Sequence, residues 1–303
     1  ILTDSLAEFS YGMCLAVTQQ RESVKMDVEK LIGLTKNAGL KAAAEAWIAA
    51  YDSLDESAVA SKALIEALTV AKADGEEKTA VDTILRKKNH LSKKSMWMVG
   101  GDGWAYDIGY GGLDHVFAMG EDVNVLIVDT EVYSNTGGQS SKATPIGAVA
   151  QFQAAGKVTA KKDLGLQMMA YDNVYVAQVS MGADKNQLMK AFREAEAHKG
   201  PSIIIAYAPC INHGIKKGMS NAQDEMKRAV ESGYWNLYRY QPETNNFILD
   251  SKEPTLALKD FLRGEVRYSA LEITFPENAE KLFAEAEAGA KEKYQHYKNR
   301  AEN

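Results

Sequence analysis

Cysteine is scarce in this chain of 303 residues, which contains only Cys14 and Cys210, far apart in the sequence. Two cysteines at such a distance do not form the disulfide framework that stabilises many small secreted proteins. A reducing compartment such as the cytoplasm is therefore the expectation.

Long hydrophobic runs and blocks of like charge are also missing. No apolar stretch approaches the roughly 20 residues that a membrane-spanning helix needs, and no signal-peptide pattern opens the chain. The 35 basic and 41 acidic residues are interspersed and give a net charge of −6, which argues against a nucleic-acid partner. With 46% hydrophobic residues, the chain can build one large or two modest domains.

The first part of the chain, residues 1–94, has a helical pattern. Apolar residues recur at helical spacing, for example at Val24, Val28 and Leu31, and Asp55–Ser57 can begin a further helix. No residue pattern in this part points to chemistry. We therefore predict a helical packing segment that belongs to the same domain as the residues that follow.

From residue 95 to residue 240, short apolar segments alternate with helical ones. This alternation predicts an α/β core with a doubly wound, mostly parallel sheet, whose strands bring their carboxyl ends to one edge. The predicted strands are 97–99, 123–128, 174–179 and 203–207, and the predicted helices are 106–119, 163–169, 185–198 and 221–232. Residues 241–303 are expected to form a largely helical C-terminal extension, most clearly over 276–299.

The most informative segment begins with Gly101-Asp102-Gly103, directly after the first predicted strand, and reaches Thr130 at the end of the next. The 26 residues between Gly103 and Thr130 suffice for one helix and one strand. Loops after successive parallel strands meet at the sheet edge where open α/β folds bind ligands. Asp102 and Thr130 can then share a hard cation through oxygen atoms, and Mg²⁺ suits a site with few protein ligands.

The glycines around Asp102 favour the same interpretation. Gly100, Gly101 and Gly103 allow the backbone to turn sharply and to approach a ligand closely. A helix that begins near Tyr106 would direct its first amides towards a phosphate group. Gly-Asp-Gly alone is typical of an ordinary turn, but together with the second loop it predicts a diphosphate held through a divalent cation.

These motifs resemble those of a known family. A Gly-Asp-Gly turn, this spacing and a polar residue at its end form the signature of thiamine-diphosphate enzymes, although Thr130 stands where Asn is usual. Residues 100–115 and 129–145 resemble pyruvate:ferredoxin (flavodoxin) oxidoreductases, in which Thr is the expected ligand. The likeness continues through 179–182, 206–212 and 232–235. The chain is therefore similar to the C-terminal thiamine-diphosphate-binding region of this family.

The resemblance implies a set of site residues. Asp102, Thr130 and the backbone carbonyl of Val132 would bind Mg²⁺. Asn135 would contact the oxo-acid substrate as a catalytic residue, although an Asn before Thr-Gly-Gly is also typical of a turn. The residues implied to hold thiamine diphosphate are Gly101, Asp102, Gly103, Trp104, Thr130, Glu131, Val132, Tyr133, Ser134 and Asn135.

Cys210 follows a predicted strand, where a single cysteine is most often a small buried hydrophobic residue. The resemblance instead makes it one ligand of a 4Fe–4S cluster, which normally needs four thiolates. The other three would lie upstream of Ile1, and Cys14 matches no cluster ligand. Because the chain opens at Ile1 without Met, we expect a piece of a longer polypeptide. The resemblance implies that the pyrimidine domain is absent from this piece, which would be inactive alone.

The resemblance implies that the parent enzyme oxidatively decarboxylates pyruvate to acetyl-CoA and CO₂, and passes electrons through iron–sulfur clusters to ferredoxin or flavodoxin. Its other implied partners are coenzyme A, the missing pyrimidine and iron–sulfur domains, and a second copy in a homodimer. The implied location is the cytoplasm, or a hydrogenosome in an anaerobic protist. The alternatives are a related 2-oxo-acid or pyruvate:NADP oxidoreductase, and a non-catalytic binding or assembly module with the same fold.

The remaining candidates are assigned to ordinary roles. His115, His198 and His213 lack the spacing of metal ligands with one another and are predicted to be polar residues of helices or loops. Five lysines are predicted to lie on the solvated surface, and the alternative is that they face an acidic ferredoxin or an anionic group: Lys157, Lys161, Lys162, Lys216 and Lys217.

Overall fold

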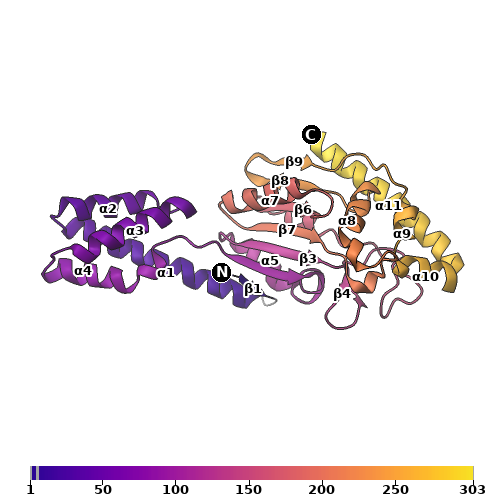
Figure 1. The fold of residues 1–303 in the computed structure, drawn as a ribbon, viewed down its shortest axis with the longest axis horizontal. Helices are drawn as coiled ribbons and strands as arrows, with labels where there is room; N and C mark the ends of the chain where they lie inside the picture. Colours follow the sequence, from indigo (N-terminus) through magenta and orange to yellow (C-terminus); the bar gives the residue numbers. More distant parts are fainter. Residues whose placement is uncertain (1, 5–6, 303) are drawn as a thin grey trace. The chain divides into compact units, whose positions relative to one another are not determined.

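The computed structural model describes residues 2–4 and 7–302, which divide into two compact units. Residues 9–96 form a helical unit, and the other described residues form an α/β unit (Figure 1). The predicted fold class, an α/β core with helical segments before and after it, is confirmed. The predicted domain limits at residues 94 and 240 stay a prediction, and the second of them falls within strand β8 (Tyr238–Gln241).

Four helices account for most of the helical unit: α1 (Ala7–Leu34), α2 (Ala38–Ala49), α3 (Leu54–Val70) and α4 (Gly75–Arg86), with the short turn η1 (Lys88–His90) after them. Side-chain caps fix where two of these helices begin. Asn37 Oδ1 accepts hydrogen bonds from the first amides of α2, and Ser53 Oγ accepts one from Glu56 N in α3. Within residues 2–4 and 7–302, no helix combines the length and the apolar character needed to cross a membrane.

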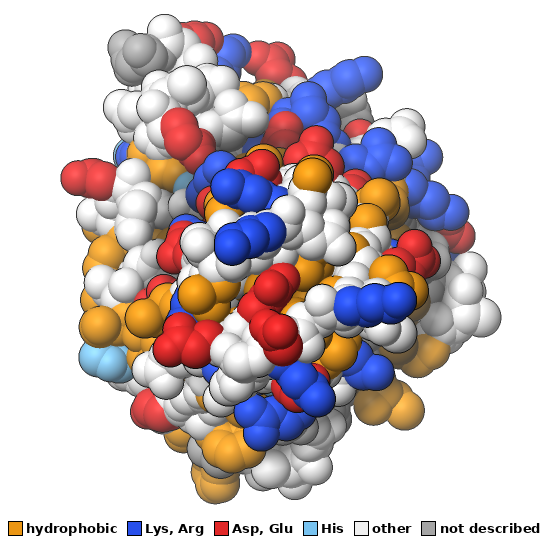
Figure 2. Space-filling view, turned by 90° about the vertical axis from the view of Figure 1, so that its left-hand side faces the viewer, with side chains coloured by type: hydrophobic (Ala, Val, Ile, Leu, Met, Phe, Trp, Pro, Cys, Tyr) orange, Lys and Arg blue, Asp and Glu red, His pale blue; other side chains and the backbone are white. Residues whose placement is uncertain are grey.

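Charges of both signs are interspersed on the face of the molecule that Figure 2 shows. On the face that Figure 2 displays, Lys and Arg side chains alternate with Asp and Glu, and the described residues form no large area of one sign. A continuous basic face is the usual electrostatic footprint of a nucleic-acid-binding domain. The displayed face therefore agrees with the mixed charge pattern of the sequence.

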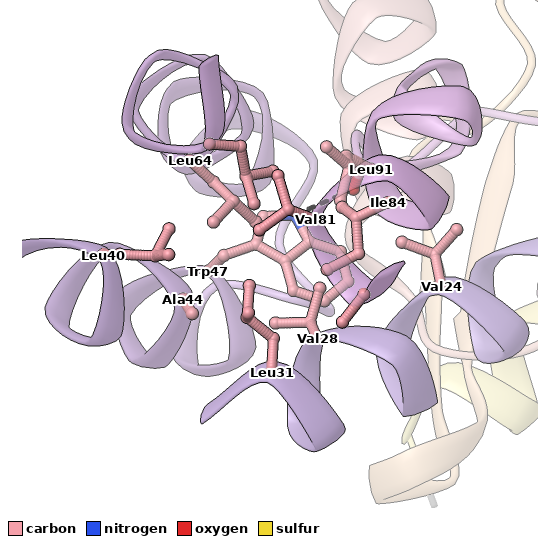
Figure 3. Packing of buried hydrophobic residues seen from close by; sticks show 12 residues of the cluster. Val24, Val28, Leu31, Leu40, Ala44, Trp47, Leu64, Val81, Ile84 and Leu91 are labelled. Atoms are coloured by element: carbon pink, nitrogen blue, oxygen red, sulfur yellow. Dashed lines mark hydrogen bonds between the residues drawn. The ribbon is translucent and has the colours of Figure 1, made fainter. Parts of the chain in front are cut away.

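Trp47 lies at the centre of the hydrophobic core of the helical unit (Figure 3). Its side chain is fully buried, and Leu31 and Leu64 pack around it from neighbouring helices. The indole Nε1 donates hydrogen bonds to Ser61 Oγ at 3.2 Å and to the Leu91 carbonyl at 3.1 Å. The one polar atom of this large side chain is thus satisfied, so its burial stabilises the unit without an unpaired donor.

A sheet of seven strands supports the α/β unit, in the order β1-β2-β3-β7-β6-β8-β9. The first five strands in this order are parallel, and β8 and β9 are antiparallel to their neighbours. Their bounds are β1 (Leu2–Asp4), β2 (Trp97–Gly101), β3 (Asn124–Asp129), β6 (Tyr175–Val179), β7 (Ser202–Tyr207), β8 (Tyr238–Gln241) and β9 (Asn246–Leu249). A separate antiparallel pair consists of β4 (Val132–Tyr133) and β5 (Gln139–Ser140).

Helices cover both faces of this sheet. α7 packs Ala191 against Ala177 on one face, whereas Gly165 of α6 approaches Val176 on the other. Adjacent strand residues point to opposite faces, so the sheet is doubly wound as predicted. The helices of the α/β unit after β2 are α5 (Tyr110–Met119), α6 (Leu164–Met168), α7 (Lys185–Ala197), α8 (Ala222–Glu231), α9 (Leu258–Leu262), α10 (Val266–Thr274) and α11 (Pro276–Glu302).

The four predicted strands are confirmed as β2, β3, β6 and β7, but the sequence analysis missed the other five. β1 stands where a helix was expected, and β9 stands in the extension that was expected to be largely helical. These strands are two to four residues long. A segment this short contains too few residues to show a period of two, so its pairing depends on the neighbouring strand.

We predict that Trp47→Ala lowers the free energy of unfolding of the helical unit by about 3–5 kcal/mol, because it leaves a large cavity in a packed core. Urea denaturation of the whole chain measures the loss. Val59, which lies in the same unit and is 71% exposed, provides the control. Val59→Ala should change the free energy by no more than about 0.5 kcal/mol. Equal effects of the two substitutions would contradict the central place of Trp47.

Candidate metal- and cofactor-binding site

Asp102 and Thr130 lie side by side at the carboxyl ends of neighbouring parallel strands. β2 ends at Gly101, and β3 ends at Asp129, so each polar residue is the first one after its strand. Thr130 Oγ1 donates to Asp102 Oδ1 at 2.8 Å, and the Thr130 backbone amide reaches the same oxygen at 3.1 Å. The two loops therefore meet at one sheet edge, where the spacing of the sequence predicts them.

More acceptor oxygen atoms surround the Thr130 hydroxyl than it can donate hydrogen bonds to. The Val132 carbonyl lies 3.1 Å from Thr130 Oγ1, in addition to the Asp102 carboxylate oxygen at 2.8 Å. A hydroxyl has a single hydrogen and can satisfy only one of these acceptors at a time. A carboxylate, a hydroxyl and a carbonyl oxygen are the hard donors that Mg²⁺ prefers. The donor set therefore fits a magnesium ion.

The Asp102 carboxylate is buried and short of compensating charge. Its side chain is only 1% exposed, and its second oxygen accepts a hydrogen bond from Ser141 Oγ at 2.8 Å. Burial, and next the negative charge of Asp129, raise the pKa of Asp102 to about 6, although Lys161 acts in the opposite direction. Because burial disfavours the ionised carboxylate, a cation beside it would be strongly stabilising.

A cleft of about 410 Å³ opens at this sheet edge. Nine of the ten residues that the resemblance implies for the cofactor line it, and Glu131 does not. The lining consists of Val99, Gly100, Gly101, Asp102, Gly103, Trp104, Val128, Thr130, Val132, Tyr133, Ser134, Asn135 and Thr136. Asn135, implied to contact the substrate, therefore lies in the same cleft as the metal-binding candidates.

The turn after Asp102 is shaped by aromatic rings that pack on glycines. A Cβ atom on Gly100 would lie 2.1 Å from the Trp104 ring, and one on Gly103 would lie 2.4 Å from the Tyr133 ring. These close approaches require glycine and bring two aromatic faces to the cleft.

The predicted helix start near Tyr106 is wrong, since a π-helical turn spans Gly103–Ile108 and α5 begins only at Tyr110.

Glu131 points away from the cleft into a buried network of charges. Its backbone has a left-handed φ of 62°, which turns its side chain beneath the end of β3. Its carboxylate accepts from Arg267 Nη2 at 2.8 Å, from Lys161 Nζ at 3.2 Å and from the Tyr234 hydroxyl. Burial alone would raise the pKa of Glu131, but Lys161 and Arg267 lower it to about 2. Glu131 thus serves as an internal anchor of the loop.

The prediction that the lysines are solvated is wrong for Lys157 and Lys161. Lys161 Nζ lies 2.7 Å from Asp129 Oδ2, and this ion pair raises the pKa of Lys161 although burial lowers it. Lys157 is 6% exposed and donates to the Ser141 carbonyl at 2.9 Å. Both lysines follow Ser141 in a long connection that folds back on the site. No local pattern in the sequence indicates this return, because Lys157 and Lys161 bind residues that are 16 and 32 positions away, respectively.

The buried network contains more acidic than basic side chains. Arg267 Nε lies 2.7 Å from Glu265 Oε2, and Glu265 in turn lies 3.6 Å from His213 Nδ1. The members of the network are Asp102, Asp129, Glu131, Glu265, Lys161, Arg267 and His213. Four carboxylates thus face one lysine, one arginine and one histidine. Negative charge remains in excess, which favours an additional cation at this edge.

Cys210 lies outside the cleft lining, on the loop after β7. It is partly exposed, and its Sγ accepts from Asn212 Nδ2 at 3.4 Å, whereas Cys14 is buried in α1. Among the described residues, no group of three or more His, Cys, Asp and Glu side chains is arranged to hold a metal ion. Any cluster bound at Cys210 therefore needs ligands from outside residues 2–4 and 7–302.

The sequence analysis missed several residues that shape the site: Asp129, Ser141, Lys161, His213, Glu265 and Arg267. Asp129 was within reach of sequence reasoning, since a charged residue that ends an apolar strand next to Thr130 is unusual. Ser141 stands in the string that carries the family resemblance, but nothing there links it to Asp102. No sequence pattern marks the distant members Glu265 and Arg267, because only the fold brings the start of α10 behind the metal-binding candidates.

We predict that Arg267→Met lowers the free energy of unfolding by about 3–5 kcal/mol, because it removes the main counter-charge of the buried Glu265 carboxylate and one of the two counter-charges of Glu131. Arg263→Met is the matched control, since its ion pair with Glu272 is solvent-exposed and should contribute little to stability. Urea denaturation measures both values. Similar losses for the two variants would show that the buried network does not stabilise the fold.

Comparison with known proteins identifies a family domain in this part of the chain. Residues 79–206 match the model of the thiamine pyrophosphate enzyme, C-terminal TPP binding domain. The matched range contains β2, β3 and both loops that carry Asp102 and Thr130. The match to the family model therefore includes every residue that lines the cleft.

Several curated relatives match nearly the whole chain. The pyruvate:ferredoxin oxidoreductase of Moorella thermoacetica is 55% identical over 99% of this chain, and the pyruvate-flavodoxin oxidoreductase of Klebsiella pneumoniae is 48% identical over 99%. The pyruvate dehydrogenase [NADP(+)] of Cryptosporidium parvum is 45% identical over 74%. The chain spans only 26% of the length of each of the first two relatives and 12% of the third.

These matches confirm the resemblance drawn from the motifs. The chain is related over nearly its whole length to the pyruvate:ferredoxin and pyruvate-flavodoxin oxidoreductases, and it corresponds to their C-terminal thiamine-pyrophosphate-binding region.

Proposed function

We propose that this chain is the thiamine-diphosphate- and Mg²⁺-binding part of an oxidoreductase that converts pyruvate and coenzyme A to acetyl-CoA and CO₂. The single observation that carries the proposal is the meeting of three kinds of oxygen donor, from Asp102, Thr130 and Val132, at one end of the cleft. The similarity to oxidoreductases that are named for pyruvate supports the choice of substrate.

The spacing of these oxygens supports magnesium as the ion. Adjacent ligands in an octahedral shell of the usual Mg²⁺ size are about 3 Å apart. Thr130 Oγ1 lies 2.8 Å from Asp102 Oδ1 and 3.1 Å from the Val132 carbonyl oxygen. In this proposal the three residues bind the ion, and the diphosphate oxygens and water complete its shell.

The remaining contacts to thiamine diphosphate would come from the two loops. Gly101 ends β2 and Gly103 and Trp104 follow it, whereas the segment Val132–Asn135 follows β3. Glu131 is retained as a cofactor-binding candidate through its backbone alone, because its side chain is held by Arg267 and Lys161. Thiamine diphosphate supplies the carbon nucleophile and the electron sink for decarboxylation, while the protein orients it.

The catalytic roles of this chain are then few. Asn135 in the cleft would contact the oxo-acid end of pyruvate through its side-chain amide. The carboxylate that activates the aminopyrimidine is assigned to a separate pyrimidine domain of the same polypeptide. The parent protein is therefore the enzyme, and the isolated chain is expected to be inactive. This division agrees with the share of 26% that the chain takes up in its relatives.

Cys210 is proposed as a ligand of a 4Fe–4S cluster in the full-length protein. Its partial exposure leaves the thiol open to ligands from elsewhere, which a core cysteine would lack. Electrons would pass through this and other clusters to ferredoxin or flavodoxin. We further propose that the full-length protein is a homodimer and that it acts in the cytoplasm, or in a hydrogenosome in an anaerobic protist.

A second candidate is a pyruvate:NADP oxidoreductase, and the relative from Cryptosporidium parvum supports it. A related 2-oxo-acid oxidoreductase or a non-catalytic binding module would use the same fold. The residues that flank this chain in the full polypeptide discriminate among them. A flavoprotein extension downstream would favour NADP as the acceptor, and loss of the upstream cysteines and pyrimidine domain would favour the non-catalytic module.

We predict that Asp102→Asn in the full-length protein abolishes activity by removing the charged ligand of the metal ion. Calorimetry should find that Mg²⁺-dependent binding of thiamine diphosphate falls at least about 10-fold. The midpoint temperature of thermal unfolding of the metal-free protein should not fall, because the substitution removes a buried, poorly compensated charge. Asp114→Asn is the control: it lies in α5 outside the cleft lining, its carboxylate accepts from the Tyr171 hydroxyl at 2.8 Å, and its substitution should leave affinity unchanged. Unaltered affinity in Asp102→Asn would refute the site.

The proposed role of Cys210 predicts a specific loss of one cluster. Cys210→Ala in the full-length protein should remove the absorbance and EPR signal of one 4Fe–4S cluster and stop electron delivery to ferredoxin. Thiamine diphosphate should still bind, since its ligands lie on other loops. Cys14→Ala is the control and should keep every cluster. A full complement of iron in Cys210→Ala would make Cys210 an ordinary structural cysteine.

A further inference from the structure

His213 is a fully buried residue on the loop that follows β7, three positions after Cys210. Its Nε2 lies 2.7 Å from the backbone carbonyl oxygen of Thr130. A carbonyl oxygen can only accept, so Nε2 must have the hydrogen and donate it. A side chain from a distant part of the sequence therefore fixes the backbone of the residue that leads into the metal-binding loop.

The Thr130 carbonyl needs such a partner because the sheet no longer provides one. The Asp129 carbonyl, one residue earlier, still accepts from Ala208 N at 2.9 Å. β3 ends there, and the chain then turns through the left-handed backbone of Glu131. Without a donor, the buried Thr130 carbonyl would be unsatisfied, which favours a rotation of the peptide group between Thr130 and Glu131. Such a rotation would displace the Thr130 hydroxyl and the Val132 carbonyl.

We propose that His213 is a positioning residue for the cation site: its hydrogen bond to the Thr130 carbonyl holds the Thr130 hydroxyl and the Val132 carbonyl in the geometry that binds Mg²⁺. This inference rests on the proposed function. It gives the histidine an effect on metal affinity that is separate from its contribution to stability. Outer contacts of this kind orient the ligands of metal sites in general.

Glu265 lies on the opposite side of His213. Its Oε1 is 3.6 Å from His213 Nδ1, which is too far for a hydrogen bond, and Glu265 is held by Arg267 Nε at 2.7 Å. Arg267 also reaches Glu131 at 2.8 Å. The segment that begins α10 thus holds Glu131 directly through Arg267, and its Glu265 faces the histidine that donates to the Thr130 carbonyl. All these side chains are buried, so water does not compete for the contacts.

A second buried histidine offers a matched control. His198 Nε2 lies 2.9 Å from the backbone carbonyl of Asn173, and its Nδ1 faces the carboxylate of Glu243. The arrangement is similar to that of His213, with a backbone carbonyl on one side and a glutamate on the other, although Glu243 is exposed and hydrogen-bonded to its histidine. None of its partners lines the cleft. Equivalent substitutions at the two histidines therefore separate an effect on the cation site from the loss of a buried hydrogen bond.

The test compares His213→Met, His213→Gln and His198→Met in the full-length protein. Isothermal titration calorimetry measures Mg²⁺ affinity at saturating thiamine diphosphate, and thermal unfolding without ligand measures stability. His213→Met should weaken Mg²⁺ binding about 10- to 100-fold, the range found for outer contacts of metal ligands. His213→Gln keeps an N–H donor near the position of Nε2 and should restore most of the affinity. His198→Met should lower stability but leave Mg²⁺ affinity at the level of the unaltered protein.

Three results would overturn the inference: equal Mg²⁺ affinity in His213→Met and the unaltered protein, no recovery in His213→Gln, or an equal loss in His198→Met. If His213→Met does not fold, His213→Gln and His213→Asn provide the comparison, because the shorter amide of Asn cannot reach the Thr130 carbonyl. Absence of Mg²⁺-dependent thiamine diphosphate binding in the unaltered protein would instead refute the proposed function, and with it the basis of this inference.

Discussion

The burial of carboxylates behind the end of β3 is the constraint on which the rest of the α/β unit depends. Asp129 and Glu131 flank Thr130, and both side chains are withdrawn from water. Buried carboxylates without counter-charges would destabilise the fold severely. Lys161 and Arg267 supply those charges, and each comes from a segment that must fold back across the sheet to reach them.

This constraint also explains why the C-terminal part of the chain belongs to the site. α10 and the residues before it place Arg267, Glu265 and, through contact, His213 beneath the loop that follows β3. The loop is thereby fixed from below while its upper side stays open to the cleft. Rigid support of this kind lets a few oxygen atoms hold a cation without moving when it binds.

The charge balance of the network gives the cleft its chemical preference. Asp102 is the carboxylate at the cleft itself, and the bases of the network are engaged mainly by Asp129, Glu131 and Glu265. An uncompensated carboxylate next to a hydroxyl and a carbonyl is a poor place for an anion alone. It becomes a good place for an anion that brings a divalent cation with it, which is how a diphosphate can bind in an acidic pocket.

The sequence by itself determined the four central strands of the parallel core and the pairing of Asp102 with Thr130, because the alternation of segments, glycine placement and a fixed spacing are local properties of a chain. It also carried the family resemblance of the residues that line the cleft. Only the tertiary structure decided the direction of Glu131, the burial of Lys157 and Lys161, and the contact of His213 with Thr130. Those features depend on partners such as Arg267, which lies 136 positions from Glu131. A local pattern cannot encode such a contact, because the fold alone brings the two charges together.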